Sequence, residues 1–568
     1  MKTIFKAFLI SASAVALLSG CIKETFPEDG NATSEQIAQS AAALKASVDG
    51  MVAQAYQPYF FYGSDNQYEF DISYAGLLIT YSRMTCDLVN NSATIGYDWW
   101  TGYTGSYGYS MAYNNARQTI PFMSLYKMIK SANDIIGALA PLGEDGLNSD
   151  TKAYLGTAYV YRALMYHDLY NMYLPAKNDY TDVSAVEGLT VPIIVSSAEE
   201  ETEYKTARAP KEVLSAFILA DLDKAEALFD GYTPRSATYP SLPVVYGIKA
   251  RMYMAIMDYA NAATYARKAI DASGKTPLTE REWTDPAKAF CDASGNNSWM
   301  WYYTIAANNM GNLCNPTGFL AGESDWGYNS ITAFSVQKWI YDRLNRTDFR
   351  KKSFIDPDRE KYPASYYRWA PGFLDDYPFD ELEDYRCFKI RCKDADWQTY
   401  SIGGAVDFPI MRVEEMYLIE AEAVGMSKGE AAGVELLENF MQTYRDPGYS
   451  YEVAETRFSE GFVKNFQEEV LYQKRVEFLG EGVGFFDAKR IRPGLKTWYE
   501  GSNIIHPTVA YDMKEVSPYW NFVIPQSEIE NNEYILKEGD VVTEIDGVKT
   551  TLNNPDPTNS VTNVPTNL

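Results

Sequence analysis

Hydrophobic positions recur at helical spacing through the middle of the chain. Over residues 152–174 apolar and aromatic side chains fall three or four positions apart, which predicts a helix. Ser149 or Asp150 is placed to cap its N-terminus. A second helix is predicted over residues 206–229, with Pro210 at its start, where the missing N–H of proline costs nothing. This part of the chain is therefore expected to be helical.

Two helical hairpins are predicted further along. Residues 242–273 form the first, and the second starts at Val413 and ends near Tyr444, with Gly429 near its turn. In the first hairpin, small and aromatic residues recur at the spacing of a tetratricopeptide repeat, in which small residues let two antiparallel helices approach closely. These positions are Ala250, Tyr253, Tyr259, Ala262 and Ala269.

The segment between the two hairpins lacks such periodicity. Residues 275–410 are rich in Trp, Tyr, Gly and Asp and contain only short strand-like pieces. The expected fold is mainly α: tetratricopeptide-like helical hairpins with a large loop-rich insertion at about 275–410 and few short strands. We expect one compact domain over residues 36–549. The remaining residues 550–568 are rich in Asn, Thr and Pro and are predicted to be a disordered tail.

The N-terminus has the pattern of an export signal. After a positively charged start, residues 7–18 form an apolar run that is too short to span a bilayer as a mature helix. It ends in Leu-Ser-Gly-Cys, which resembles the lipobox of bacterial lipoproteins and predicts a signal peptide at residues 1–20. Cys21 is then the lipidation site, and residues 21–35 are a polar tether. The alternative is an ordinary signal peptide with a cysteine near its cleavage site.

Charge and composition exclude several functions. The 568 residues carry 50 Lys+Arg against 76 Asp+Glu, a net charge of −26, so binding of nucleic acid by bulk electrostatics is not expected. Only 2 histidines are present, which excludes a histidine-rich metal site. Of the 6 cysteines, the five beyond Cys21 form no CxxC pair and are predicted to be buried free thiols. We expect no cofactor and assign no metal-binding residue.

Six segments together resemble the RagB/SusD family of nutrient-uptake outer-membrane lipoproteins, and they run in the family's order from about residue 70 to 535. The family's 'R-A-hydrophobic…Y…D-L' helix and the strand and helix after it are matched by Arg162–Leu164, Tyr166, Asp168–Leu169, Gly188–Pro192, Arg208–Val213, Asp221–Leu222 and Ala225. The family's C-terminal signatures are matched by Phe408–Arg412, Glu415, Tyr417–Leu418, Ala421–Ala423, Lys474–Phe478, Glu481–Gly482, Phe486–Asp487, Arg490, Pro525–Ile529 and Asn532.

The acidic residues of the C-terminal block raise the alternative of an enzyme. Glu477 and Glu481 are four residues apart, with Arg475 and Arg490 nearby, which favours an ion network at a helix end over a pair of catalytic acids. The sequence contains no G-x-S-x-G elbow and no G-x-G-x-x-G loop. His167 is predicted to be a hydrogen-bonded residue of the core. We therefore expect no enzymatic activity.

The resemblance implies a surface lipoprotein of the outer membrane, held there by its lipid. It would capture an oligomeric nutrient, which we expect to be an oligosaccharide or polysaccharide, and deliver it to a TonB-dependent, SusC-like barrel transporter. One alternative is peptide uptake by a member of the same family. Another is a surface glycoside hydrolase, whose two carboxyl groups would lie about 5–5.5 Å or about 6.5–9.5 Å apart.

Aromatic clusters are the candidate binding residues, because a sugar ring offers an apolar C–H face to an aromatic plane. In starch-binding members of the family, two regions and a preceding arginine build the binding arc. The matching candidates are Trp100, Trp326, Arg83, Trp99, Tyr302 and Tyr103. The alternative is that these rings fill the core beneath long loops, in which case Trp100 and Trp326 would not be exposed.

Overall fold

The computed structural model describes residues 40–56, 74–90, 116–179, 183–195, 207–309, 311, 315–331, 333–504, 512–532, 535, 542–545 and 548–551. The predicted signal peptide, the tether with Cys21, and the tail beyond residue 551 lie outside these residues. So do three of the candidate binding residues, Trp99, Trp100 and Tyr103.

Helices dominate this part of the chain, as predicted. The longer ones are α3 (Ala41–Gln54), α4 (Tyr74–Met84), α5 (Ala116–Leu139), α7 (Ser149–Tyr173), α8 (Lys211–Leu228), α9 (Leu242–Ala255), α10 (Tyr259–Ser273), α16 (Val413–Lys428), α17 (Glu430–Tyr444), α19 (Phe466–Glu477) and α20 (Gly484–Ile491). The shorter ones are α6 (Gly143–Gly146), α11 (Glu280–Trp283), α12 (Pro316–Leu320), α13 (Lys338–Asp342), α14 (Phe373–Asp376), α15 (Tyr400–Gly403), α18 (Tyr451–Thr456) and α21 (Gln526–Asn531).

The strands form short antiparallel pairs. These pairs are β1 (Leu88–Asn90) with β3 (Phe334–Val336), β2 (Trp299–Thr304) with β4 (Asp407–Arg412), β5 (Leu495–Lys496) with β6 (Asp512–Met513), and β7 (Val542–Ile545) with β8 (Val548–Thr551). Their small size confirms the expectation of few short strands.

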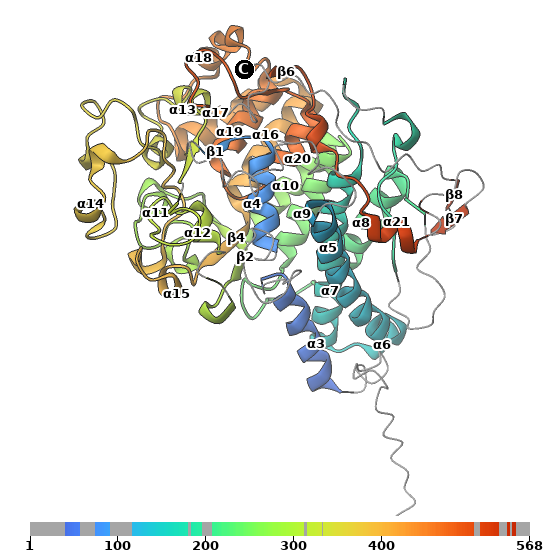
Figure 1. Cartoon of the computed structure of the whole chain (residues 1–568). Helices are drawn as coiled ribbons and strands as arrows, with labels where there is room; N and C mark the ends of the chain where they lie inside the picture. The colour runs from blue at the N-terminus through green and yellow to red at the C-terminus, as the bar shows by residue number, and fades with distance from the viewer. Residues whose placement is uncertain are drawn as a thin grey trace, which may run out of the picture.

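The longer helices pack side by side in chain order. Contacts join α5 to α7, α7 to α8, α8 to α9, and α9 to α10. Helix α10 then packs on α16, although the insertion separates the two in sequence, and α16 packs on α17 and α19. Figure 1 shows these helices as one body, with α11, α12, α14 and α15 of the insertion on its left side. The tetratricopeptide-like stack is therefore continuous in space.

Capping residues define where these helices begin. Helix α7 begins after Asn148, whose side chain accepts the Thr151 N–H at 2.9 Å while its own N–H donates to the Thr151 hydroxyl at 2.8 Å. The prediction of Ser149 or Asp150 as the cap is wrong, because both already lie within the helix. The second predicted helix begins later than expected, at Lys211, with Pro210 as its extended N-cap.

Both predicted hairpins are present. Asp258 caps α10 with its side chain, and Gly274 ends the helix in the left-handed conformation at φ 60°. Between α16 and α17 the turn is a single residue, Gly429, whose φ of 113° is a conformation that only glycine adopts readily. The predicted turn position is therefore confirmed.

One strand pair joins two segments of the insertion close to the helical body. Trp299 at the start of β2 lies opposite Arg412 at the end of β4, immediately before α16 begins. Beyond this base the insertion has short helices and a hydrophobic cluster of its own, which includes Trp326, Phe373 and Trp397. The loop-rich character predicted for this segment is confirmed.

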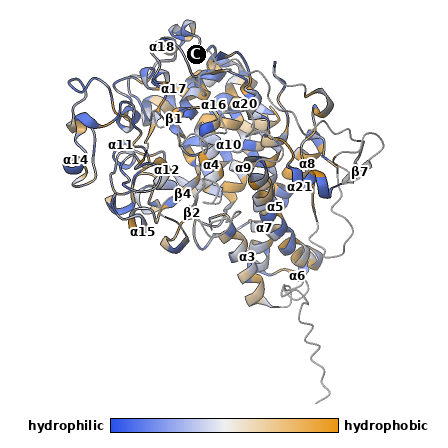
Figure 2. Ribbon diagram, in the orientation of Figure 1, coloured by the Kyte–Doolittle hydropathy of each residue, from blue (hydrophilic) through white to orange (hydrophobic). Residues whose placement is uncertain are grey.

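Buried thiols and mixed helix surfaces complete the picture. Cys86, Cys291, Cys387 and Cys392 are buried and free, as predicted, and Cys314 lies outside the described residues. Hydrophobic and hydrophilic positions alternate along the helices (Figure 2). In the described part of the chain, none of the helices combines the length and the hydropathy that crossing a bilayer requires.

Candidate functional site

The C-terminal charged block is a buried ion network. Glu477, at the end of α19, accepts hydrogen bonds from Arg445 at 2.7 and 2.8 Å and from Arg412 at 3.1 Å, and Arg350 lies 3.4 Å away. Burial raises the pKa of Glu477, but the three arginines outweigh it and hold the pKa well below its usual range. A carboxyl group that stays ionised in this way is a poor general acid.

The partners in this network differ from those that sequence proximity suggests. Arg475 donates to Asp87, the residue before β1, with Nε at 2.8 Å from Oδ1. Arg490 donates to Asp487 at 2.6 Å and to Glu422 at 2.7 Å. The structural role of the block is thus as predicted, whereas the assignment of Arg475 and Arg490 to Glu477 and Glu481 is wrong.

Another pair of family motif residues is also joined by an ion pair. Arg162 in α7 donates to both carboxylate oxygens of Asp221 in α8, at 2.7 and 2.8 Å, and to Asn133 in α5 at 2.8 Å. All of these side chains are buried. The matched motifs therefore tie neighbouring helices together.

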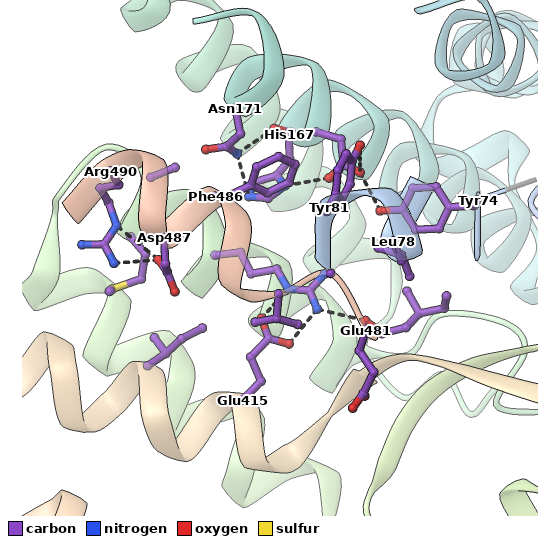
Figure 3. Close-up of a pocket in the computed structure, with 18 residues that line it drawn as sticks. Tyr74, Leu78, Tyr81, His167, Asn171, Glu415, Glu481, Phe486, Asp487 and Arg490 are labelled. Atoms are coloured by element: carbon purple, nitrogen blue, oxygen red, sulfur yellow. Dashed lines mark hydrogen bonds and ion pairs between the residues drawn. The ribbon is translucent and has the colours of Figure 1, made fainter. Parts of the chain in front are cut away.

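A cavity of about 60 Å³, lined by both apolar and charged side chains, lies between α4, α7, α9, α16 and α20 (Figure 3). Arg251 donates to both oxygens of Glu415 at 2.6 Å, and Asp168 accepts the Tyr74 hydroxyl at 2.8 Å. His167 is buried and lies 3.2 Å from Asp168, which agrees with its prediction as a core residue. This volume suits a few water molecules and is too small for a sugar ring.

Arg83 and Tyr302 lie in separate parts of the structure. Arg83, in the last turn of α4, is 3 % exposed, and its guanidinium group lies 5.1 Å over the Phe334 ring of β3. Tyr302 is half-buried in β2, with its ring 5.9 Å from that of Trp299. The two side chains therefore pack against different aromatic rings.

Trp326 is a core residue of the insertion. Its side chain is only 4 % exposed, and its indole N–H donates to Asn315 at 3.2 Å. A Cβ at position 403 would lie 2.8 Å from its ring, so Gly403 makes room for it. Of the two alternatives that the sequence left open, exposed binder or core, the structure places Trp326 in the core.

A pocket of about 200 Å³ opens on the insertion next to this core. We call it the insertion pocket, and its lining includes Asn329, Phe373, Asp376, Tyr377, Glu381 and Arg386. Asp376 and Glu381 are exposed, whereas Arg386 is buried and donates to the Gly322 carbonyl at 2.6 and 2.9 Å. Phe373 and Tyr377 form an aromatic wall of this pocket, and most of the other lining residues are polar.

Tyr377 is the partly exposed aromatic side chain of this wall. Its ring stacks on Phe373 with centroids 5.1 Å apart, and its hydroxyl donates to Asp325 at 2.7 Å. Burial, this hydrogen bond and the charge of Asp325 raise the pKa of Tyr377 to about 12, so the hydroxyl stays protonated. Such a wall can contact an apolar ligand face while the rim binds hydroxyl groups.

The insertion pocket is not among the sites predicted from the sequence. Residues 366–379 hold Tyr, Trp and Phe interleaved with Asp, Pro and Gly, the same kind of signal as the predicted aromatic clusters. The signal was present, but the contact between Tyr377 and Asp325 joins residues 52 positions apart. Such a contact forms only in the folded chain and leaves no local pattern in the sequence.

Comparisons with known proteins give a consistent result. A family model described as "Starch-binding associating with outer membrane" matches residues 32–254, and a model of the SusD family matches residues 364–537. No curated protein matches the chain.

Several solved structures share the fold. A SusD-like carbohydrate binding protein from Bacteroides vulgatus is 19 % identical, with 87 % of this chain and 96 % of that chain covered and a TM-score of 0.62. A SusD superfamily protein from Bacteroides thetaiotaomicron is 17 % identical, with 89 % and 99 % covered and a TM-score of 0.63. Surface glycan-binding protein A of Bacteroides thetaiotaomicron, solved with laminarihexaose, is 14 % identical, with 87 % and 98 % covered and a TM-score of 0.58.

The family models, the fold and the motif contacts agree. The two models match the N-terminal and C-terminal parts of the chain, on either side of most of the insertion. The motif residues within them form the buried ion pairs Arg162–Asp221 and Arg412–Glu477. The chain therefore belongs to the SusD/RagB family of proteins, which associates with the outer membrane.

Proposed function

We propose that this protein is a non-catalytic lipoprotein of the cell surface that captures a glycan and delivers it to a TonB-dependent, SusC-like barrel transporter. The observation that carries the proposal is the match of residues 32–254 to a family model described as starch-binding and associated with the outer membrane. The relative solved with laminarihexaose supports the same ligand class.

The insertion pocket has the chemistry that a glycan needs. A pyranose ring has an apolar C–H face and a rim of hydroxyl groups. The half-buried ring of Tyr377 offers a plane for the face, and the exposed carboxylates of Asp376 and Glu381 can accept hydrogen bonds from the hydroxyls. At about 200 Å³ the pocket is smaller than the usual range of about 300–1,000 Å³ for ligand sites, so it would hold one part of a longer chain.

The aromatic residues predicted from the sequence have different places in this proposal. Trp326 supports the insertion pocket from within its core. Trp99, Trp100 and Tyr103 remain proposed contacts for further sugar units of the same ligand. Arg83 and Tyr302 are less favoured as ligand contacts. Arg83 is buried against the Phe334 ring, and Tyr302 packs on Trp299.

Binding without catalysis is proposed because the buried carboxylates described above already have partners. Glu477 and Glu415 are engaged by arginines, and Asp168 by tyrosine hydroxyls. The glycoside hydrolase alternative would need one carboxyl group that stays protonated near neutral pH. Glu477, which the sequence offered as such an acid, has its pKa shifted in the opposite direction.

Replacing Tyr377 by Ala tests the proposed function. Loss of a stacked aromatic anchor costs about 2 kcal/mol or more at a binding hot spot, which is about a 30-fold weaker affinity. Binding is measured by calorimetry with laminarihexaose and with the best ligand from a glycan array, using the full chain with Cys21→Ser. The matched control, Tyr377→Phe, keeps the ring and should bind like the parent protein.

Three outcomes would contradict the proposal. Unaltered affinity of a folded Tyr377→Ala protein would show that the insertion pocket does not bind the glycan. Binding of peptides but of no glycan on the array would favour the peptide alternative. Release of shorter sugars from a bound polysaccharide would show a hydrolase.

A further inference from the structure

A second pocket concentrates positive charge on an otherwise acidic protein. Its volume is about 240 Å³, and it lies where α13, α19 and β6 come together, in the upper part of Figure 1. We call it the basic pocket, and its lining includes Lys464, Arg475, Lys496, Lys514, Trp339 and Phe462. The whole chain has 76 acidic against 50 basic residues, so four cationic side chains in one pocket depart strongly from its composition.

The aromatic and cationic side chains form one continuous stack. The Trp339 and Phe462 rings are nearly parallel, with 7° between their planes and 5.0 Å between centroids. The Arg475 guanidinium group lies 4.8 Å from the Trp339 centroid, and the Lys496 ammonium lies 5.4 Å from that of Phe462. The stack holds Arg475 and Lys496 next to the two rings, and all four side chains line the pocket.

Two of the four cations are available to a ligand. Arg475 is neutralised by Asp87, and Lys464 donates to the Pro493 carbonyl at 2.6 Å. Within the described ranges no carboxylate lies within ion-pair distance of Lys496 or Lys514. Asp512 also lines the pocket and supplies a single opposing charge.

The pocket is shaped by a close approach of the backbone. Gly494 has a φ of 91°, and a Cβ there would lie 2.4 Å from the Met513 carbonyl oxygen. Gly494 therefore lets the segment that leads into β5 pass directly against β6. In this antiparallel pair Lys496 lies opposite Asp512, and Lys514 follows two residues after Asp512, so the two lysines are diagonal neighbours.

We propose that the basic pocket binds an acidic sugar unit, with its carboxylate at Lys496 and Lys514 and its ring against Phe462. This inference rests on the proposed function, since it assigns the captured glycan to the acidic polysaccharides. The aromatic rings of Trp339 and Phe462 in the lining favour an organic ring over a small inorganic anion. The unpaired lysines favour a charged ring over a neutral one, because an acidic protein otherwise repels negatively charged ligands.

Oligosaccharides of galacturonate and of glucuronate, each compared with its methyl ester, test the proposal. The ester keeps the ring and removes the charge. We expect the acids to bind the full-length Cys21→Ser protein at least tenfold more tightly than the esters, and to bind more weakly as NaCl increases. In a Lys496→Met, Lys514→Met protein the difference should disappear. The matched control is Lys428→Met, which replaces an exposed lysine at the end of α16. This control should leave the difference between acids and esters unchanged.

Each other outcome would overturn the inference. Equal binding of acids and esters would show that charge is not recognised. Equal binding of hexaglutamate would assign the pocket to an acidic peptide, and competition by inorganic sulfate at equal concentration would make it a simple anion site. Binding of laminarihexaose with no binding of either acid would refute this inference alone, whereas binding of neither class would also refute the proposed function.

Discussion

Three arginines from distant parts of the chain meet at Glu477. Arg350 comes from the insertion, Arg412 from the end of β4 and Arg445 from the residue after α17, and all are fully buried. Moving these groups out of water costs free energy that only their mutual contacts offset. The network therefore fixes how the insertion, the last hairpin and α19 fit together.

Removing the charge of Glu477 should destabilise the protein strongly. A Glu477→Gln change leaves three buried arginines with less negative charge, and breaking a buried ion pair in this way typically costs about 3–5 kcal/mol. The free energy of unfolding is measured by denaturant titration. Glu435→Gln, on the exposed face of α17, is the control and should change it by less than about 0.5 kcal/mol. Equal effects of the two changes would contradict the structural role of the network.

The same pair of proteins should differ less in acid. The pKa of Glu477 is lower in the folded protein than its ordinary value of 4.5. Below about pH 4.5 the unfolded chain therefore binds a proton that the folded protein does not, and the contribution of Glu477 to stability falls as the pH falls. The difference in unfolding free energy between parent and Glu477→Gln should be largest near pH 7 and smaller near pH 3.

At the scale of elements, the close packing of helices depends on small residues at their contacts. In α17, a Cβ at Gly433 would lie 2.5 Å from the Gly425 Cα and 2.7 Å from the Ala421 carbonyl oxygen of α16. Both of these atoms belong to the backbone, so a rotamer change cannot relieve the contact. The two helices can approach this closely only while position 433 has no side chain.

A Gly433→Ala change should therefore separate α16 from α17 and lower stability. Overpacking of a tight contact typically costs about 1–3 kcal/mol, which exceeds the gain of about 0.5–1 kcal/mol from alanine in a helix. Gly50→Ala in α3 is the control, because a Cβ there meets nothing within 4 Å. This control should raise the melting temperature, whereas Gly433→Ala should lower it. A rise in both proteins would show that the close approach is absent.

The helical elements could be predicted from the sequence because their signals are local. Small residues at repeat spacing defined the first hairpin, and Gly429 marked the turn of the second. The binding surfaces could not be predicted in this way. The sequence left open whether Trp326 is exposed or buried, and Asn315 and Gly403 enclose it in the fold, while Tyr377 lies beside the distant Asp325. Loop segments are positioned by such long-range contacts, which leave no periodic pattern.

At the scale of the whole molecule, the distribution of charge separates two surfaces. The insertion pocket has acidic groups on its rim, whereas the basic pocket carries unpaired lysines beside aromatic rings. On a chain with a net charge of −26, these surfaces would favour different parts of a ligand. A glycan with neutral and acidic units could then be held at two separate points.

At the same scale, the predicted lipid anchor would attach the whole molecule to the membrane. The family associates with the outer membrane. We expect attachment to depend on a lipid at Cys21, because the Leu-Ser-Gly-Cys sequence there resembles a lipobox and each buried methylene of an acyl chain contributes about 0.8 kcal/mol. A Cys21→Ser protein should move from the membrane fraction, washed at high pH to remove bound partners, to the soluble fraction. Its melting temperature should not change, because Cys21 begins a predicted tether, residues 21–35, that is mainly polar in sequence. Ser19→Ala, which keeps the cysteine, should remain in the membrane fraction, and a Cys21→Ser protein that also remained there would refute lipid anchoring at this residue.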